Sequence, residues 1–307
     1  MNRDEFIRQA ETLNEAELLA IAEESRVRSG SRIPPEVAAK FRSLDDVTEA
    51  HELFVETAWG KTHVFMIRNA GVQEDLQPVI VNVHGGGWCL PHTERDIYFC
   101  RRLARRTGCL VVDVDYVLAP EHPYPAAIEE IEALLDHLPT LLKEWGGDPN
   151  RVILCGQSAG GNLVGAVTQR KRLPKELGIL KQILCYLPTD NYTNRFGNAE
   201  LSPRDESTEY YGFFYNRVFE ERKNSDVSLV FANEEDVKDL PETDIITAGL
   251  DNLMPEAKQY EEILRKAGVP GIYHCFSQSR HGFLVNLYDE WLEGENLLTD
   301  LIQNVIQ

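Results

Sequence analysis

Short apolar runs recur along the chain and are separated by longer segments in which apolar and polar positions alternate. The runs lie at 79–83, 110–114, 151–155, 182–187 and 244–248 and are rich in Val, Ile and Leu. Short runs that are apolar throughout are typical of strands buried on both faces, as in a parallel sheet. Helix-like segments lie between them, so the pattern predicts an α/β fold, a mostly parallel central sheet with helices on both faces.

The segments between the runs have apolar positions at helical spacing. We expect helices at 94–107, 126–145, 159–172, 255–267 and 288–306, with a final strand at 271–276. Pro139 falls inside the second helix. Because proline lacks an N–H and its ring clashes with the preceding turn, it predicts a kink or a break there.

Two regions depart from this rhythm. Residues 1–50 are polar and helix-like, with Asn14 and Glu17 spaced as an N-cap and its capping-box partner. They would bury little alone, so we expect them to lie over another part of the molecule. Residues 51–68 alternate like a hairpin at a sheet edge, and the segment 188–238 interrupts the order of strands and helices.

Composition narrows the class of protein and of partner. The 307 residues are 43% hydrophobic and 26% charged, as in ordinary globular proteins, and a single α/β domain can be that long. The 31 basic residues against 50 acidic ones give a net charge of −19. That charge argues against nucleic acid or an anionic membrane as a partner and says nothing about a neutral small molecule.

The six cysteines show no C-x-x-C spacing, and several lie within apolar runs. We interpret them as buried free thiols in a reducing compartment. No apolar signal segment follows Met1, and no run of about 18 apolar residues occurs, so we expect a cytoplasmic protein without a membrane span. No Cys/His cluster has the spacing of metal ligands, and no metal or organic cofactor is expected.

A Gly-x-Ser-x-Gly motif at 156–160 joins the strand expected at 151–155 to the helix expected at 159–172. A strand that turns sharply into a helix needs small residues beside the corner, and here glycines flank Ser158. In such a nucleophile elbow the serine is held on a strained turn with its hydroxyl exposed. The motif alone also fits a glycine-rich loop with an incidental serine.

A second glycine-rich segment, at 84–87, comes directly after the strand expected at 79–83. Consecutive glycines expose backbone N–H groups, which can stabilise an oxyanion during acyl transfer. A flexible turn or a phosphate-binding loop would use glycines too, but the combination with the elbow favours acyl transfer. The candidate oxyanion-hole residues are Gly85, Gly86, Gly87 and Ala159.

The chain order of a triad beside such an elbow is serine, acid, histidine. Asp251 lies just past the strand expected at 244–248, and His281 lies just past the last expected strand. Both then reach the strand-end edge where Ser158 lies and where parallel sheets bind their ligands. We interpret Ser158, Asp251 and His281 as the nucleophile, the acid and the base.

The remaining histidines and acids fit these roles less well. His84 is expected to support the glycine loop. Three histidines precede the serine and do not fit the order, namely His92, His122 and His137. The nearest competing acids are Asp190 and Glu256, and we interpret Asp190 as a residue that fixes its loop.

These motifs, together with the segment 116–127, resemble those of the hormone-sensitive-lipase-like esterases, the bacterial family IV carboxylesterases. The resemblance runs from about residue 78 to 281–283. It implies an α/β-hydrolase fold and a serine carboxylesterase with the triad and oxyanion residues named above. It further implies a helical cap, made of N-terminal helices over 1–50 and an insertion at about 189–238 of a catalytic domain over 51–307.

Two positions depart from the pattern of that family. Gln157 stands where the family usually has Asp before the nucleophile, which removes a charge beside the elbow. After Asp251 the family usually continues Pro-Leu-Arg-Asp-Glu, whereas this chain reads Asn-Leu-Met-Pro-Glu at 252–256. Neither departure touches a triad residue, so both bear on local salt bridges and on substrate preference.

The densest aromatic cluster of the chain lies at 209–219. Phe213 and Phe214 of this cluster, with Trp88 after the glycine loop, are the candidates for the walls of the substrate pocket. Bulky rings there would favour short acyl groups, acetyl to butyryl. Cys89, beside Trp88, is interpreted either as a thiol at the site or as a buried inert one.

The expected partner is a small-molecule ester, for which an acetylated sugar, an aryl ester or a xenobiotic would all fit, and a homodimer stays open. Two alternatives remain. One is an amidase or peptidase of related fold, and the other is a ligand-binding relative without catalysis. The presence of His281 argues against the second, because such relatives replace this histidine.

Overall fold

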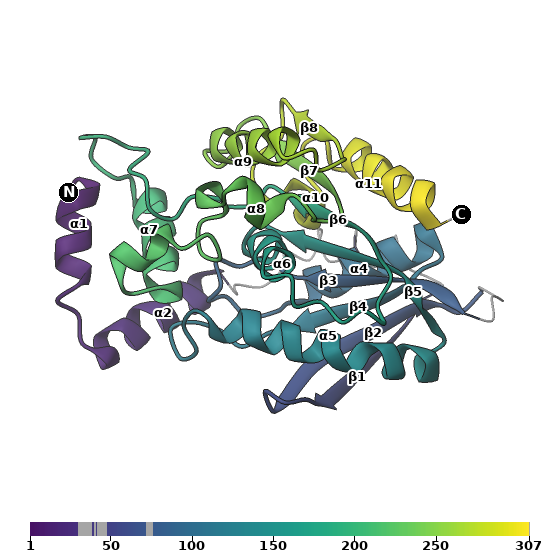
Figure 1. Ribbon diagram of the computed structural model, residues 1–307. Coiled ribbons are helices and arrows are strands. Elements are labelled where there is room, and N and C mark those ends of the chain that lie inside the picture. Colours follow the sequence, from purple (N-terminus) through teal and green to yellow (C-terminus); the bar gives the residue numbers. More distant parts are fainter. Residues whose placement is uncertain (30–38, 40, 42–47, 72–75, 307) are drawn as a thin grey trace.

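The computed structural model describes residues 1–29, 39, 41, 48–71 and 76–306 (Figure 1). Within them, eight strands form one sheet in the order β1-β2-β4-β3-β5-β6-β7-β8. The two pairings that involve β2 are antiparallel, and all the others are parallel. The strands are β1 (Thr48–Glu56), β2 (Lys61–Asn69), β3 (Gln77–Val83), β4 (Leu110–Asp115), β5 (Gly147–Gln157), β6 (Ile179–Cys185), β7 (Glu242–Ala248) and β8 (Tyr273–Phe276).

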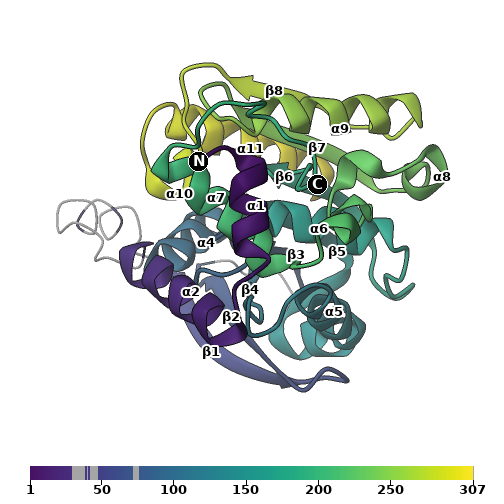
Figure 2. The same ribbon diagram turned by 90° about the vertical axis from the view of Figure 1, so that its left-hand side faces the viewer.

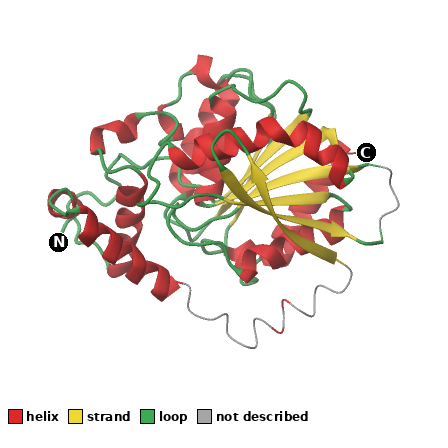
Figure 3. Cartoon of the chain, turned by 90° about the horizontal axis from the view of Figure 1, so that it is seen from below, coloured by secondary structure: helices red, strands yellow, loops and turns green. Residues whose placement is uncertain are grey.

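Alternate side chains of the sheet enter two separate cores. On β3, Val81 belongs to one core and Ile80 to the other, because successive side chains of a strand point to opposite faces. Helices cover both faces (Figure 3), so the predicted α/β architecture is confirmed. The first core takes residues from α5 (Ala126–Trp145), α6 (Ala159–Gln169) and α9 (Met254–Lys266), and the second from α4 (Glu94–Thr107), α10 (Phe283–Asn286) and α11 (Trp291–Ile306).

Helix α5 runs through Pro139 without ending, so Pro139 does not break the helix. Leu134, Leu135, Leu138 and Leu142 on this helix are all buried. An internal proline costs roughly 3 kcal/mol, and burying one leucine side chain contributes about 1.5–3 kcal/mol. The packing of four leucines therefore outweighs the hydrogen bond that proline removes.

The C-terminal elements differ in detail from the prediction. The last strand begins at Tyr273, and the helix expected over 288–306 begins only at Trp291, after the short helix α10. Leu287 and Asp289 between the two helices have φ of 56° and 53°. Left-handed backbone cannot continue a right-handed helix, so the chain breaks there into two pieces.

A third layer, which we call the cap, lies over one end of the sheet (Figures 1 and 2). Its helices α1, α2 and α7 share an apolar cluster in which Phe6 and Leu18 pack with Phe213 and Phe214. The predicted boundary near residue 50 falls beside residues outside the described part of the chain. The cap comprises α1 (Arg3–Ala10), α2 (Glu15–Ser29), α7 (Pro203–Tyr215) and η1 (Phe219–Lys223), whereas η2 (Leu229–Phe231) and α8 (Glu234–Val237) pack on α9.

Helix α2 is fixed at both of its ends. At its start, the backbone N–H of Glu17 donates to Asn14 at 3.1 Å and that of Asn14 to Glu17 at 2.9 Å, which confirms the predicted capping box. Near its end, Arg26 makes two 2.6 Å contacts with the carboxylate of Glu121. Its Nε donates to the carbonyl of Cys89 at 2.9 Å, so α2 is joined to the segment that follows the glycine loop.

Candidate active site

Ser158 occupies the corner between β5 and α6 and has a strained backbone. Its φ of 53° and ψ of −123° lie where side chains are rarely found. Its N–H donates to the carbonyl of Cys185 on the neighbouring strand at 2.8 Å, and its carbonyl accepts from Asn162 in the first turn of the helix. These bonds on both sides hold the residue in a conformation that it would not adopt alone.

The flanking glycines are required by the close approach of other backbone atoms. A Cβ on Gly160 would lie 2.0 Å from the carbonyl oxygen of Val83 and 2.5 Å from that of His84. A Cβ on Gly156 would lie 2.4 Å from the carbonyl oxygen of Gly160. The helix can therefore start directly against the end of β3 only because these positions lack side chains.

The structure brings together the three residues that the sequence singled out as a triad. His281 Nε2 lies 2.9 Å from Ser158 Oγ, and His281 Nδ1 lies 2.6 Å from Asp251 Oδ2. Asp251 is nearly buried, whereas the ring of His281 is about one quarter exposed. A carboxylate at this distance holds the ring with Nδ1 protonated, which leaves Nε2 free to accept the proton of Ser158.

Neighbouring groups fix the orientation of the histidine and the acid. The backbone N–H of Leu253 donates to Asp251 Oδ1 at 3.2 Å. The hydroxyl of Tyr288 donates to the carbonyl of His281. The ring of Tyr186 meets the imidazole edge-to-face with centroids 5.2 Å apart. The loops after β7 and β8 are thus each anchored within a few residues of the group they present.

The glycine loop lies directly against the elbow. A Cβ on Gly85 would lie 2.9 Å from the carbonyl oxygen of Gln157 and 3.2 Å from Ser158 Cβ. Gly86 and Gly87 have φ of 128° and 58°, and the carbonyl of Gly86 accepts from Leu90 at 2.9 Å, which closes a tight turn. Within the described residues, no hydrogen bond uses the N–H of Gly86, Gly87 or Ala159.

His84 supports this loop, as predicted. Its Nδ1 lies 2.6 Å from the carbonyl oxygen of Gly85, and its ring stacks on Tyr116 with centroids 4.4 Å apart. The hydroxyl of Tyr116 in turn donates to the carbonyl of His84 at 3.1 Å. The imidazole is fully buried and does not reach the cavity.

A cavity of about 640 Å³ opens between the sheet edge and the cap. Ser158, His281 and the glycine loop form its floor, and Trp88 lies in its wall as predicted. The expectation for Phe213 and Phe214 is wrong, because neither lines the cavity. Both rings are buried within the cap cluster, where Phe214 stacks on Tyr210.

Tyr211 takes the place in the wall that we expected the two phenylalanines to fill. A Cβ on Gly87 would lie 2.5 Å from Cδ2 of Tyr211, so the ring rests on the glycine loop. At about 100° per residue, Tyr211 lies roughly 60° around the same helix from Phe214 and roughly 160° from Phe213. The aromatic cluster pointed to the right helix, but its spacing did not distinguish the face turned to the cavity from the face turned to α1.

The structure favours the second interpretation of Cys89, a buried thiol, because the residue is fully buried. It does not line the cavity, and burial raises the pKa of its thiol to about 12. A thiol that remains protonated at neutral pH is neither nucleophile nor ready target of alkylation. All six cysteines are free, and five of them are buried.

The family comparison covers the segment that carries these motifs. Residues 80–285 match the family described as alpha/beta hydrolase fold. The chain belongs to the α/β-hydrolase family. The fold predicted from the motif resemblance is thereby confirmed at the level of this family.

Several related α/β-hydrolases are named esterases. The chain is 32% identical to esterase LipI of Mycobacterium tuberculosis, over 67% of this chain and 66% of the relative. It is also 32% identical to carboxylesterase NlhH of the same organism, over 64% of each. The matched region thus spans slightly less than two thirds of these relatives' lengths.

Solved structures agree over nearly the whole fold. A hyperthermophilic esterase from Pyrobaculum calidifontis superimposes with a TM-score of 0.79 at 23% identity, covering 99% of both chains. A thermostable esterase from Pseudomonas putida ECU1011 gives a TM-score of 0.76 at 23% identity, covering 94% of this chain and 97% of the other. At this identity the agreement concerns the fold.

Gln157, the residue before Ser158, ends a series of buried polar contacts behind the elbow. Its Nε2 donates to Asn82 at 2.8 Å, Asn82 donates to Asp113 at 2.7 Å, and Asp113 lies 2.7 Å from His92 Nε2. His92 belongs to the segment after the glycine loop. This series of hydrogen bonds therefore links Gln157 to the segment that directly follows the glycine loop.

At the end of this series farthest from Gln157, His92 and Asp113 attract each other by opposite charge. Burial lowers the pKa of His92, but the charge and hydrogen bond of Asp113 raise it more, to about 9. Burial likewise raises the pKa of Asp113, but His92 and the hydrogen bond from Asn82 bring it below its ordinary value. Both groups are thus ionised at neutral pH, so the site carries an internal ion pair although position 157 is uncharged.

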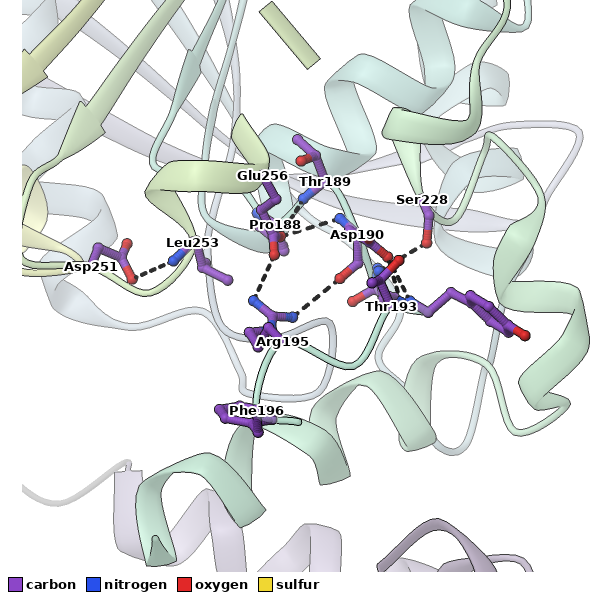
Figure 4. A network of polar contacts seen from close by, with 12 residues as sticks. Pro188, Thr189, Asp190, Thr193, Arg195, Phe196, Ser228, Asp251, Leu253 and Glu256 are labelled. Carbon is purple, nitrogen blue, oxygen red and sulfur yellow. Dashed lines mark hydrogen bonds and ion pairs between the residues drawn. The ribbon is translucent and has the colours of Figure 1, made fainter. Parts of the chain in front are cut away.

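The segment after β6 and the start of α9 form a second polar network (Figure 4). Glu256 accepts from the backbone N–H of Thr189 at 2.8 Å and lies 2.6 Å from Arg195 Nη1. Asp190 Oδ1 accepts from the backbone N–H groups of residues 192 and 193, so it fixes its own loop, as predicted. Because Asp251 lies five residues before Glu256, the network also holds the loop of the candidate acid.

The described part of the chain lacks two further features. No cluster of three or more His, Cys, Asp or Glu there could hold a metal ion. No helix there is long and apolar enough to cross a membrane.

We predict that Gly160→Ala destabilises the protein by about 3 kcal/mol or more, because rigid backbone carbonyls would have to move away from the new methyl group. Urea unfolding measures the effect. The matched control is Gly212→Ala, also inside a helix, where the nearest atom to the added Cβ lies at 3.5 Å. That variant should be as stable as wild type or gain up to about 1 kcal/mol. Equal stability of both variants would contradict the packing argument.

We predict a pH-dependent effect of Glu256→Gln. Burial raises the pKa of Glu256 from 4.5 to about 7, although Arg195 and two backbone N–H groups oppose this. A raised carboxyl pKa means that the folded state binds the proton more tightly, so stability falls as pH rises from about 4.5 to about 7. Wild type should therefore lose up to about 3 kcal/mol relative to Glu256→Gln across this window.

Urea unfolding of both proteins at intervals from pH 4.5 to pH 8 tests this prediction. The control is Glu262→Gln, which removes an exposed carboxyl from the same helix and should keep the wild-type pH dependence. Parallel pH profiles of wild type and Glu256→Gln would mean that Arg195 fully compensates the burial of the carboxylate.

Proposed function

We propose that this protein is a serine carboxylesterase that works through an acyl-enzyme intermediate. The observation that carries the proposal is the hydrogen-bonded series from Asp251 through His281 to Ser158, which ends on a serine in strained backbone. A nucleophile, a base and an orienting acid in this arrangement are what acyl transfer requires. The names of the related esterases support the same chemistry.

In the first half-reaction, His281 Nε2 removes the proton from Ser158 Oγ as the oxygen attacks the ester carbonyl. The carboxylate of Asp251 stabilises the imidazolium that forms. Negative charge develops on the former carbonyl oxygen, which the N–H groups of Gly86, Gly87 and Ala159 would hold. Because those groups are preorganised beside Ser158, no reorganisation is needed when the charge appears.

Collapse of the tetrahedral intermediate breaks the bond to the alcohol, which leaves with the proton from His281. Water then takes the place of the alcohol. His281 accepts a proton from this water as it attacks the acyl carbon, and returns it to Ser158 when the acid is released. The donors of the glycine loop serve both steps, since each passes through an oxyanion at the same position.

The preference for acetyl to butyryl esters stays part of this proposal, but other aromatic rings form the wall of the acyl pocket. Tyr211 and Trp88, instead of Phe213 and Phe214, provide the rings that narrow the cavity above Ser158. A ring that rests on Gly87 limits how far an acyl chain can extend beside the oxyanion loop. Binding of longer chains would require this ring to move.

We expect Ser158→Ala to lower kcat on an activated ester by about 10⁴-fold or more, because the covalent route is lost. Stopped-flow or steady-state release of 4-nitrophenol from its acetate measures this. Ser277→Ala, an exposed serine outside the cavity, is the control and should retain wild-type kcat. Matched acetanilide and aryl acetate substrates separate esterase from amidase, and the proposal requires the ester to be the better substrate. Retention of more than about a tenth of kcat by Ser158→Ala would assign the nucleophile elsewhere.

We expect Tyr211→Ala to extend the range of acyl chains. Removing the ring opens the wall beside the glycine loop, so kcat/KM for octanoyl and decanoyl esters should rise relative to that for acetyl esters, by about tenfold. The control is Tyr210→Ala, which removes the neighbouring ring, one that packs on Phe6 and does not line the cavity. The test is to measure kcat/KM of wild type and of both variants on 4-nitrophenyl esters of increasing acyl length. The same profile for all three would remove Tyr211 from the acyl site.

A further inference from the structure

The cavity wall is rich in carboxylates, and each of them has a partner among the described residues. Asp251 is bonded to His281, and Glu209 forms an ion pair with Arg3 at 2.9 Å. Asp96 and Asp205 each accept hydrogen bonds from the residue that caps their helix, Thr93 and Ser202 respectively. The acidic groups of the wall are therefore engaged within the protein.

The arginines of the cavity wall differ in the polar partners that balance their charge. Arg195 lies 2.6 Å from the carboxylate of Glu256, and Figure 4 shows its guanidinium turned toward that group. Arg95 donates to the side-chain oxygen of Asn286 at 2.8 Å. Arg222, in η1, also lines the cavity, yet within the described residues no carboxylate lies at ion-pair distance from it.

The guanidinium of Arg222 is buried and incompletely bonded. Only 1% of the residue is exposed. Its Nε donates to the carbonyl of Asn216 at 2.9 Å, whereas its buried Nη2 has no hydrogen-bond partner in the described part of the protein. The rings of Phe213 and Phe219 lie 5.6 and 5.3 Å from its central carbon. Aromatic faces attract a cation weakly and do not replace an anion.

The acid whose charge acts most strongly on Arg222 is Glu209, and it cannot neutralise this cation. Glu209 is already paired with the equally buried Arg3, so two guanidinium groups share one carboxylate. Burial lowers the pKa of Arg222 to about 10, against the favourable charges of Glu209 and, more weakly, of the exposed Glu11. The side chain is thus still charged at neutral pH, and the three groups together keep one uncompensated positive charge inside the cap.

Space for a ligand exists beside this charge. Gly212 of α7 lines the cavity, and a Cβ placed there would lie 3.5 Å from Arg222 Nη1 and 3.8 Å from Asn191 Oδ1. The absence of a side chain at position 212 therefore leaves Nη1 bordered by the cavity. Asn191 and Gly212 belong to different segments, so the position is enclosed from two sides.

We propose that Arg222 binds a carboxylate of the substrate, so that the preferred esters carry a free carboxylate in addition to the scissile bond. This inference rests on the proposed esterase function and names its substrate class. A guanidinium matches a carboxylate by charge and by paired N–H donors. A monoanion suits the site better than a phosphate dianion, because one unpaired cation stands among several carboxylates.

The kinetic test compares pairs of esters that differ only in this charge. The 4-nitrophenyl hemiesters of succinic, glutaric and adipic acid are each paired with the diester in which a methyl group caps the free carboxylate. Rates measured with Ser158→Ala are subtracted, because hemiesters also hydrolyse spontaneously. In wild type, kcat/KM should favour the free acid by about tenfold or more at one chain length at least.

Substitution of Arg222 should abolish that preference. The ratio of kcat/KM for free acid to capped ester should fall by about tenfold in Arg222→Gln, and less in Arg222→Lys, which keeps the charge. Because both values of the ratio come from the same protein, a general loss of activity in the variant does not change it. Lys223→Gln is the matched control, because it removes the same charge from the next, exposed residue and should leave the ratio unchanged. A wild-type preference for the capped esters at every length, or equal ratios in wild type and Arg222→Gln, would overturn the proposal.

A binding measurement separates this inference from the esterase proposal. Calorimetric titration of Ser158→Ala with monomethyl glutarate requires no turnover. Its dissociation constant should rise about tenfold or more when Arg222→Gln is added to the same background. If neutral and charged esters are not hydrolysed but binding depends on Arg222, the esterase proposal fails and the anion site stands. If esters are hydrolysed and binding does not depend on Arg222, the anion site is refuted alone.

Discussion

The contact of α6 with the end of β3 constrains everything else at this site. The backbone of Gly160 approaches the carbonyls of Val83 and His84 so closely that no Cβ fits between them. This contact starts the helix immediately after the strand and forces Ser158, between the two, into left-handed backbone. It also fixes where β3 ends relative to the serine, and the glycine loop begins at that point. The strained Ser158 and the candidate oxyanion donors are thus placed by a single close packing of backbone on backbone.

Behind this contact, the polar series from Gln157 to His92 makes the same connection with side chains. It crosses β3 and β4 through Asn82 and Asp113 and returns to the segment that follows the glycine loop. All four groups are buried or nearly so, and a buried polar series of this kind is stable only if each member is bonded. The neutral amide of Gln157 suits its place, because Asn82 presents an acceptor there and directs its own donor to Asp113. Position 157 therefore needs a hydrogen-bond donor, which the amide of Gln157 supplies and an ionised aspartate would lack.

The sequence predicted the sheet, the elbow and the meeting of Ser158, Asp251 and His281 because each depends on local signals of known meaning. Buried strands are short and apolar throughout, and residues that follow parallel strands meet at one edge, so the positions of Asp251 and His281 sufficed to bring them to Ser158. The cap was less predictable. Its aromatic segment has two adjoining apolar faces, and only packing against α1 decides that Phe213 and Phe214 turn inward while Tyr211 turns to the cavity. Arg222 lies in the run Glu-Glu-Arg-Lys, which is typical of a solvated turn. No local signal shows that the third of these four charges is buried.

The buried charges of the cap follow a different logic from those of the core. The core pairs His92 with Asp113 and Lys181 with Asp244, each within 2.7 Å. Its buried Glu130 lacks a cation among the described residues, but burial raises the pKa of this carboxyl to about 7, so it can take up a proton. The cap buries Arg3, Glu209 and Arg222 and leaves one cation without a counterion. An unpaired buried charge costs several kcal/mol, and an apolar side chain of similar volume would pack the same space without that cost. A cap that served only to cover the active site would gain stability by losing Arg222. The cost is explained if the anion that completes the balance belongs to the substrate, because binding then restores a pairing that folding alone leaves open.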